Sequence, residues 1–342
     1  MSLPLSIQSD FSLRTLNTFG VEARAHAYLQ VDHADVLAAV RNDPDLCALP
    51  RLVLGGGSNI LLTADFAGLV LHMRSTGIAI IGEDADAVHV RAAAGENWHG
   101  LVLWTLAQGL AGLENLSLIP GSVGASPIQN IGAYGLEVAE RILSLRIFDF
   151  ATGKVVEMAR LACGFQYRDS IFKHALRDRA VVLDVTFALP KVWQPTLGYA
   201  ELAQELTAKM IDPPSAKEVS NAVIAIRSRK LPDPADIGNA GSFFKNPLVS
   251  AAQRDALLAS FPQLVSHVQS DGRFKLAAGW LIDQCGWKGK SIGAAGVYEK
   301  QALVLVNRGG ASGKDIAALA EAIRRDVQSR FDVLLEAEPI QL

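Results

Sequence analysis

The chain has 342 residues, half of them hydrophobic and a fifth charged, with a formal net charge of −3. This length exceeds what one hydrophobic core usually supports, so we expect two or three domains of an ordinary globular protein. The small net charge argues against nucleic acid as a partner. The three cysteines are few and scattered, which argues against a set of structural disulfides. The seven histidines lack the spacing of metal ligands, which argues against a bound metal.

The N-terminal residues 1–8 lack a basic region followed by an apolar core, which predicts no signal peptide. No apolar run is long enough to span a bilayer, so we expect no membrane insertion. The few, scattered cysteines are typical of a reducing cytoplasm, and with these two features they predict a cytoplasmic location.

The first part of the chain predicts alternating strands and helices. A strand over residues 27–31 precedes Asp32, which is placed to cap a short helix over 35–40. A brief buried strand over 52–54 enters a turn of three glycines, and alternating runs between 69 and 94 predict further strands.

The middle of the chain begins with a helix opened by Asn97. The runs 142–150 and 154–158 predict a hairpin, and 180–189 predicts another strand. A capping box at Ser215 starts a helix that ends near Lys230, where following prolines mark a domain boundary.

The last part predicts a helix over 275–284, a strand over 302–306, a long helix started by Ser312 and a strand over 333–335. The whole order is that of an α+β protein.

Two glycine-bearing runs point to a large ligand that approaches the backbone closely. Residues 118–135 form an apolar loop rich in glycine, in which Gln129 and Asn130 offer amides suited to the edge of a flavin or nucleobase. Residues 55–59 follow a buried strand and could present consecutive N–H groups to a pyrophosphate. A tight interdomain crossing and a tight strand exit are the alternative interpretations. The Rossmann and P-loop fingerprints are both missing.

Three further polar positions have competing interpretations. Arg168 could clamp a carboxylate or phosphate, or could form an ion pair with Asp169 or Asp178. Ser242 follows a glycine and lacks an adjacent histidine, which argues against a hydrolase nucleophile. It could be a proton donor or a hydrogen-bonding group, or it could only turn the chain. Glu338 could take part in proton transfer or be a solvated terminal carboxylate.

A series of distinctive blocks runs in order from Asn17 to Glu338: NTFG, GGGSNILL, GENWHGLV, GLENLSLIPGSVGASPIQNIGAYG, FQYRDSIFK, RSRKLPDP, GNAGSFFKNP, KLAAGWLIDQCGWKG, QALVLVN and LEAE. In this order they resemble the UDP-N-acetylenolpyruvoylglucosamine reductase (MurB) family. The segment that contains Tyr199 is similar to the larger subtype of that family, which has a tyrosine-bearing loop over the substrate.

The resemblance implies a vanillyl-alcohol-oxidase (PCMH)-type FAD-binding fold in two subdomains, followed by a C-terminal α+β substrate-binding domain. We expect these at residues 1–74, 75–230 and 231–331, with the last strand, about 332–342, returning to the first subdomain. The implied reaction is the NADPH-dependent, FAD-mediated reduction of UDP-N-acetylglucosamine enolpyruvate to UDP-N-acetylmuramate in peptidoglycan synthesis. Hydride goes to C3 and a proton to C2. We expect a monomer.

The resemblance also implies roles for individual residues. Three residues are implied to be catalytic: Arg168 would bind the substrate carboxylate, Ser242 would donate the proton, and Glu338 would act beside the same centre. Those implied to hold FAD are Gly55, Gly56, Gly57, Ser58, Asn59, Gly121, Ser122, Gly124, Ala125, Gln129, Asn130, Ile131 and Arg227. Those implied to hold the UDP-sugar are Tyr134, Tyr199, Lys230, Lys245, Asn246 and Gln301.

The C-terminus departs from the family pattern. The family usually reads Glu-Pro-Glu-Val-Arg, whereas this chain has Pro339 after Glu338, which removes a backbone donor beside the carboxylate. Two other functions stay open from the residues alone. One is another flavin oxidase of the same cofactor fold, and the other is a non-catalytic module that binds a nucleotide sugar or flavin.

Overall fold

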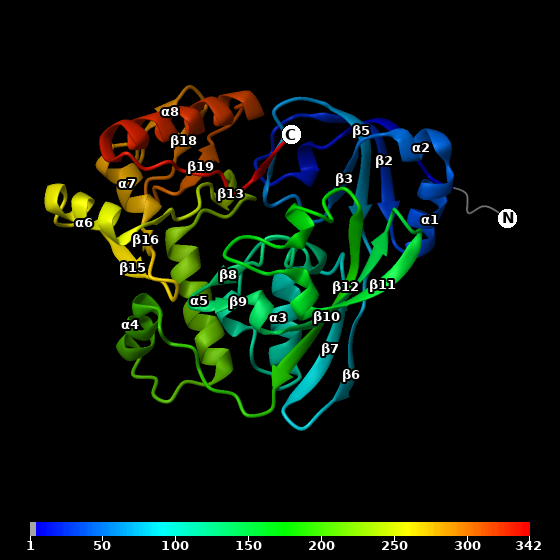
Figure 1. The fold of residues 1–342 in the computed structure, drawn as a ribbon, viewed down its shortest axis with the longest axis horizontal. Coiled ribbons are helices and arrows are strands. Elements are labelled where there is room, and N and C mark those ends of the chain that lie inside the picture. The colour runs from blue at the N-terminus through cyan, green and yellow to red at the C-terminus, as the bar shows by residue number, and fades with distance from the viewer. Residues whose placement is uncertain (1–4) are drawn as a thin grey trace. The chain divides into compact units, whose positions relative to one another are not determined.

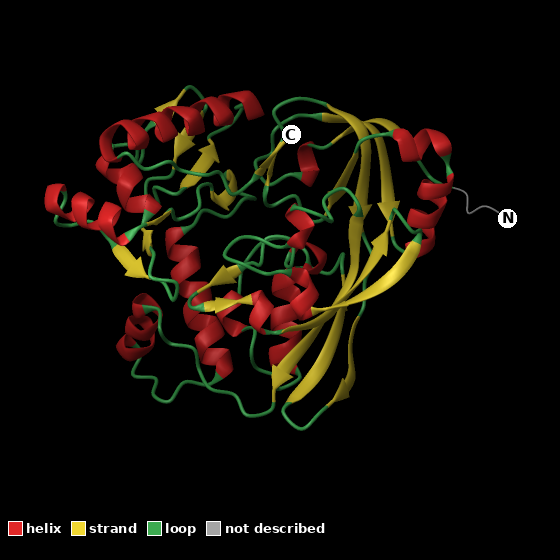
Figure 2. Ribbon diagram, viewed as in Figure 1, coloured by secondary structure: helices red, strands yellow, loops and turns green. Residues whose placement is uncertain are grey.

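The computed structural model describes residues 5–342. Residues 1–4, which belong to the N-terminal segment that predicts no signal peptide, lie outside the described part. Contacts divide the chain into two compact units. The first takes the chain up to Phe11, Ala25–Gly57 and Phe66–Arg229, and the second takes Ser12–Arg24, Ser58–Asp65 and Lys230–Leu342. The division into three domains stays a prediction. The structure contains both helices and strands (Figure 2), and the strands come mostly in runs that pair antiparallel, which confirms the α+β class.

The first unit begins with a four-stranded sheet in the order β1-β2-β5-β3. Its strands are β1 (Gln8–Ser12), β2 (Arg24–Val31), β5 (Phe66–Met73) and β3 (Arg51–Leu54). The central strand β5 pairs in parallel with β2 and β3, and its residues are almost all buried, as expected for a strand covered on both faces. The carboxyl end of β3 leads directly into Gly55.

Two short helices, α1 (Ala34–Asn42) and α2 (Pro44–Ala48), follow β2. The prediction that Asp32 caps the first helix is wrong, because His33 occupies the N-cap with extended backbone and makes no side-chain cap bond. The cap with a side-chain bond belongs to the second helix, where Asp43 accepts from two backbone N–H groups and Pro44 occupies the first turn.

The second sheet of this unit is antiparallel throughout, in the order β11-β10-β12-β7-β6 (Figure 1). Its strands are β11 (Lys154–Ala159), β10 (Ile142–Asp149), β12 (Ala180–Pro190), β7 (Ala87–Ala93) and β6 (Ile78–Glu83). The predicted hairpin is therefore confirmed as β10–β11. Helix α3 (Trp98–Ala107) shares a core with this sheet, and Asn97 caps it as expected.

The rest of the first unit is short elements and two helices. The hairpin of β8 (Gly132–Ala133) and β9 (Leu136–Glu137) begins within the last residues of the glycine-rich loop 118–135. Helices α4 (Ala200–Ala208) and α5 (Ala216–Lys230) share a small apolar core. Ser215 and Glu218 form the predicted capping interaction before α5. The 3-10 turns here are η2 (Glu114–Leu116), η3 (Val123–Ala125), η4 (Val138–Glu140), η5 (Arg160–Cys163) and η6 (Ile171–Lys173).

The second unit contains two small antiparallel sheets. One has the order β13 (Gly238–Ser242), β19 (Val304–Asn307), β18 (Ala295–Val297) and β17 (Ser291–Ile292); the other has β14 (Leu248–Val249), β16 (Phe274–Leu276) and β15 (Ser266–Val268). Its helices are α6 (Ala251–Ser260), α7 (Ala278–Gln284) and α8 (Gly313–Phe331), with the 3-10 turn η1 (Arg14–Leu16). Ser312 starts α8 with a capping box, as predicted.

Two predictions for this unit need correction. The helix predicted over 275–284 begins only at Ala278, because the residues up to Leu276 pair in β16. The strand predicted over 333–335 is not a strand, although buried and exposed residues alternate there. Pairing occurs further on, at Ala337 and in β20 (Ile340–Gln341), which runs parallel to β4 (Ile60–Leu61).

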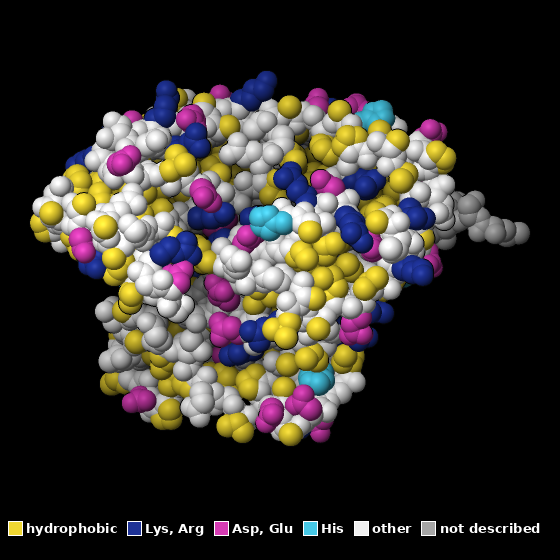
Figure 3. All heavy atoms as spheres, viewed as in Figure 1, with side chains coloured by type: hydrophobic (Ala, Val, Ile, Leu, Met, Phe, Trp, Pro, Cys, Tyr) yellow, Lys and Arg dark blue, Asp and Glu magenta, His cyan; other side chains and the backbone are white. Residues whose placement is uncertain are grey.

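The surface carries both signs of charge. On the face in Figure 3, acidic and basic side chains are interspersed, in keeping with the small net charge. Among residues 5–342, no helix is both long and apolar enough to cross a membrane, and no group of three or more acidic, histidine or cysteine side chains is placed to hold a metal.

Candidate active site

The two glycine-bearing runs of the first unit lie in direct contact. A Cβ added to Gly56 would lie 2.9 Å from the Cα atom of Gly121, and one added to Gly55 would overlap Ser122 Oγ. Gly57 and Gly121 both have positive φ, at 60° and 117°. Glycine is therefore required here both for close approach of two backbones and for their local conformation.

The second run is held by the segment that enters α3. Trp98 N–H donates to Gly121 O (3.0 Å) and Val123 N–H donates to Glu96 O (2.9 Å). Gly124 N–H donates to Ala94 O, and a Cβ on Gly124 would lie 2.5 Å from the Cβ of Ala94. The block GENWHGLV and the glycine-rich loop after it are therefore joined by backbone hydrogen bonds into one structural unit.

Asn130 is buried with φ of +48° and uses its side chain inside the protein. Its Nδ2 group donates to Glu137 Oε2 (2.7 Å) and to Gln166 O (3.1 Å), while Oδ1 accepts from Ala139 N–H (3.0 Å). This amide fixes the end of the loop. Gln129, beside it, is half-buried, as are Ile131 and Gly124, whereas Ala125 is exposed.

Arg168 lies next to this loop. Its Nη2 group donates to Gly132 O at 2.8 Å, and its guanidinium lies 5.2 Å from the centre of the Tyr167 ring. The carboxylates considered as its ion-pair partners have other neighbours: Asp169 pairs with His174 (2.8 Å) and Asp178 with Arg177 (3.7 Å). The half-buried guanidinium of Arg168 is therefore held at the β8–β9 hairpin.

Two of the predicted sugar-nucleotide residues contact one another. The rings of Tyr134 and Tyr199 lie 5.1 Å apart in an edge-to-face arrangement. Burial raises the pKa of Tyr134 to about 12, so its hydroxyl is a neutral hydrogen-bonding group. Asn115, which is fully buried, donates to both Tyr134 O (2.8 Å) and Thr196 O (2.9 Å) and so joins the tyrosine-bearing segment to this site.

Arg227 of α5 is the unusual cation of the first unit. Its Nε atom is buried and has no hydrogen-bond partner among the described residues. Burial lowers the pKa of its guanidinium, with Tyr134 opposing the effect. A buried donor without a partner is costly, so this atom marks a place where a ligand acceptor would be stabilising.

In the second unit, Ser242 is the last residue of β13 and is exposed. The register of β13 against β19 shifts between Asn239 and Ser242, and Gly241 has φ of +69°. Asn239 Oδ1 accepts from Gly241 N–H (2.9 Å), and Asn239 N–H donates to Thr18 O (2.9 Å). The bulge presents the serine hydroxyl on a rigid strand end.

Glu338 lies beside this strand end. Glu338 N–H donates to Phe243 O (2.8 Å), and Lys245 N–H donates to Glu336 O (2.9 Å), so the two segments run antiparallel around one bridge. Glu336 is exposed and its carboxylate accepts from Lys245 Nζ (3.0 Å). Asn59, which follows Ser58 in the same unit, donates to Glu338 O (3.3 Å).

The other predicted residues of the second unit have structural partners as well. Asn246 Oδ1 accepts from Ala278 N–H (3.0 Å) at the start of α7, and Gln301 Oε1 accepts from Leu303 N–H (3.3 Å). Lys230 is half-buried at the carboxyl end of α5, where the helix dipole favours a cation.

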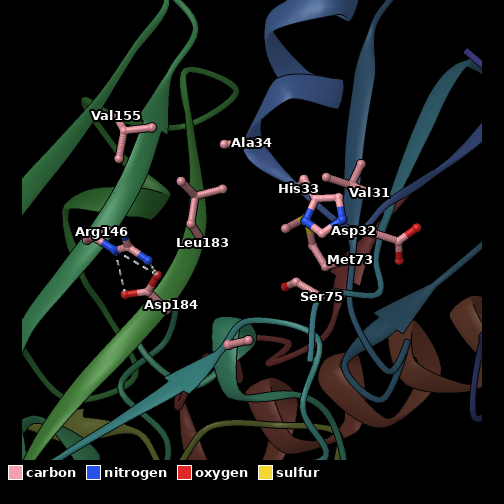
Figure 4. Close-up of a pocket in the computed structure, with 11 residues that line it drawn as sticks. Val31, Asp32, His33, Ala34, Met73, Ser75, Arg146, Val155, Leu183 and Asp184 are labelled. Carbon is pink, nitrogen blue, oxygen red and sulfur yellow. Dashed lines mark hydrogen bonds and ion pairs between the residues drawn. The ribbon is translucent and has the colours of Figure 1, made fainter. Parts of the chain in front are cut away.

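A pocket of about 230 Å³ lies elsewhere in the first unit (Figure 4). Its walls come from the ends of β2 and β5 and from the face of the second sheet, and no predicted site residue lines it. The dashed lines in Figure 4 join Arg146 to the buried carboxylate of Asp184. Arg146 and Asp184 pair with each other, and Asp32 and His33 also line the pocket.

Comparison with known proteins decides the family. Residues 25–159 match the family model of an FAD binding domain, and residues 233–342 match the C-terminal domain of UDP-N-acetylenolpyruvoylglucosamine reductase. A protein named UDP-N-acetylenolpyruvoylglucosamine reductase from Paraburkholderia phytofirmans is 60% identical, covering 97% of this chain and 96% of the relative. Another from Paraburkholderia phymatum is 58% identical and covers 100% of both. The chain belongs to this reductase family.

The fold agrees with that membership. The crystal structure of the reductase from Thermus caldophilus superposes with a TM-score of 0.68, covering 99% of this chain and 98% of the other at 23% identity. The predicted family, the FAD-binding fold with its C-terminal domain, the FAD cofactor and the oxidoreductase class are confirmed. Membership also implies NADPH and a UDP-sugar as substrates.

The residues present fit FAD. Glycines where a Cβ would collide allow the backbone to approach a flat or phosphorylated group, and Arg227 Nε is a buried donor without a protein acceptor. Sequence reasoning did not single out Asn115 or Asn239, whose amides hold the neighbouring site segments. The signal available for Asn115 was its place in the block GLENLSLIPGSVGASPIQNIGAYG.

Proposed function

We propose that Arg168, Ser242 and Glu338 carry out the chemistry by which this reductase converts UDP-N-acetylglucosamine enolpyruvate to UDP-N-acetylmuramate. The product is a precursor of peptidoglycan. The observation that carries the proposal is the exposed Ser242 hydroxyl at the bulged end of β13, beside the Glu338 backbone. A rigid strand end suits a group that must deliver a proton to one carbon atom.

The chemistry requires a cation and a proton donor. FAD, which the residues assigned below would hold, would supply the hydride that adds to C3 of the enolpyruvyl group. The negative charge that develops spreads onto the substrate carboxylate, and the guanidinium of Arg168 would stabilise it. The Ser242 hydroxyl would then protonate C2. A neutral hydroxyl is a weak acid, so neighbouring groups must assist it, and Lys245 and Glu338 are our candidates.

The remaining residues would bind the two ligands. We assign Gly55, Gly56, Gly57, Ser58, Asn59, Gly121, Ser122, Gly124, Ala125, Gln129, Asn130, Ile131 and Arg227 to FAD. We assign Tyr134, Tyr199, Lys230, Lys245, Asn246 and Gln301 to the UDP-sugar. The buried, partnerless Nε of Arg227 and the contact between Tyr134 and Tyr199 support these assignments. We further propose a monomer that works in the cytoplasm without nucleic acid.

The test is the pair of half-reactions followed anaerobically through the flavin spectrum. NADPH is added to the oxidised holoenzyme, and the enolpyruvyl sugar is added after the flavin has bleached. In Ser242→Ala we expect bleaching at the wild-type rate, because the serine has no part in it, and recovery at least about a hundredfold slower, as is typical for loss of a general acid. Ser260→Ala, an exposed serine at the end of α6, is the matched control.

If Ser242→Ala recovers as fast as Ser260→Ala, the serine is not the proton donor. A wild-type flavin that bleaches with NADPH and never recovers with the sugar would instead favour a flavin oxidase of the same cofactor fold. The outcomes therefore separate a wrong residue from a wrong substrate.

A further inference from the structure

His99 lies in the first turn of α3 and is half-buried. Its Nδ1 atom accepts a hydrogen bond from Leu118 N–H at 3.0 Å. A ring nitrogen that accepts from an amide cannot itself be protonated. The imidazole is therefore neutral in this arrangement, with its proton on Nε2.

Leu118 is the first residue of the glycine-rich loop, and its φ is +60°. Left-handed backbone is rare for a residue with a branched side chain and needs support from its surroundings. The Leu118 amide has that support in the imidazole of His99. The turn at Leu118 sets the direction in which the chain enters residues 119–124.

The segment before the loop has two further anchors. Trp98 Nε1–H donates to Leu116 O at 2.9 Å, and the buried hydroxyls of Ser117 and Ser220 lie 2.8 Å apart. Ser220 and Arg227 are seven residues apart on α5, which places them on one face of that helix. Three consecutive residues are thus fixed between α3 and α5, and His99 makes the last of the three contacts.

We propose that neutral His99 is a positioning residue for flavin binding: by accepting the Leu118 amide it holds Leu118 in its left-handed conformation and thereby fixes the glycine-rich segment 121–131. The role rests on the proposed assignment of that segment to FAD. It concerns the shape of the binding loop and requires no contact between His99 and the cofactor.

The charges around His99 favour the neutral form. Burial lowers the pKa of His99, and Arg227 of α5 lowers it further. Residues 116–124 contain no titratable side chain, and Glu96, before α3, accepts from Gly77 N–H. The acceptor is therefore present at neutral pH and is lost only when acid protonates the ring below the ordinary histidine range.

The test uses variants that keep or remove an acceptor at the Nδ1 position. His99→Asn places its Oδ1 near Nδ1 and does not titrate, whereas His99→Ala has no acceptor and His99→Gln has its amide near Nε2. The exposed His26→Ala is the matched control. For each protein we would measure amide hydrogen exchange in peptides that contain Leu118, FAD affinity of the apoprotein, and thermal unfolding of the apoprotein.

We expect His99→Ala and His99→Gln to exchange the Leu118 amide about tenfold faster and to bind FAD about tenfold more weakly, the effect of losing one hydrogen bond. His99→Asn should restore both. Acidification should weaken FAD binding in the wild type and not in His99→Asn. If His99→Ala does not fold, the comparison of Asn with Gln carries the test.

Wild-type exchange and affinity in His99→Gln would overturn the proposal, and so would equal losses in Asn and Gln. A wild-type apoprotein that binds no FAD would refute the flavin assignment alone. Exchange at Leu118 would then still report whether His99 holds that residue.

Discussion

The contact between the two glycine-bearing runs gives the most direct test of the cofactor site. Gly56→Ala would place a methyl group 2.9 Å from the Cα atom of Gly121. Carbon atoms in contact prefer about 3.5–4.0 Å, so the two backbones must separate by about 0.6 Å or more. The added methyl carbon and the Cα atom of Gly121 are both fixed to the backbone, so rotation of a side chain cannot relieve the clash.

The magnitude follows from the cost of overpacking, about 1–3 kcal/mol. The apoprotein can relieve this strain by moving the runs apart, but binding FAD between them would require their return. Strain that the apoprotein retains lowers its free energy of unfolding, and strain that it relieves reappears as weaker binding. Because 1.4 kcal/mol is a tenfold change, we expect FAD affinity to fall by about ten- to a hundredfold if most of the strain is relieved.

The assay is titration of the apoprotein with FAD, together with urea unfolding of the apoprotein. Gly82→Ala is the matched control, because a Cβ at that exposed position of β6 meets nothing within 4 Å. It should bind FAD normally and be equally or slightly more stable. The reasoning is refuted if Gly56→Ala matches Gly82→Ala in both affinity and unfolding free energy.

Substitutions at three other positions have defined outcomes. Arg179 donates two hydrogen bonds of 2.8 Å to the buried carboxylate of Asp149 and holds its pKa well below the usual range, so Asp149→Asn should lower the unfolding free energy at pH 7 by about 1–3 kcal/mol. The difference in unfolding free energy between the wild type and Asp149→Asn should narrow as the pH falls below about 4, because protonation of Asp149 then removes the same contribution from the wild type. Urea unfolding of both proteins at pH 7 and below about pH 4 measures this change. Ser312→Ala removes the capping box of α8 and should cost about 1 kcal/mol, while Ser312→Thr should not. The phenol of Tyr134 should ionise only near pH 12 in an ultraviolet titration, and Tyr134→Phe should remove that step.

Local signals predicted elements wherever the sequence carried its own start or stop. Asn97, Ser215 and Ser312 cap helices as expected, because a cap bond depends on residues three apart in sequence. The helix predicted from residue 275 failed because its first residues pair with β14 and β15, and no local pattern reports that pairing. The prediction of Asp32 as a cap failed because the N-cap of α1 lies one residue later, at His33.

The site was predictable as a set of blocks, but the contacts that hold it together were not. Glycine, serine and arginine positions stand out in long ordered motifs, which is why the family could be named. The side chains of Asn115, Asn239 and His99 bond to backbone atoms of residues between two and eighty-one positions away. A backbone carbonyl or amide leaves no residue-specific trace in a single sequence, so such contacts become visible only in the fold.

The departure at Pro339 illustrates the same limit. In sequence, a proline beside Glu338 removes a backbone donor next to a predicted catalytic carboxylate. In the structure the donors that matter lie on either side: Glu338 N–H bonds to Phe243 O, and Ile340 N–H bonds to Asn59 O. The chain bends at 338–339 between these two pairings, and Pro339 is buried at the bend. No strand requires its N–H, and its fixed φ restricts the corner from which the Glu338 side chain projects.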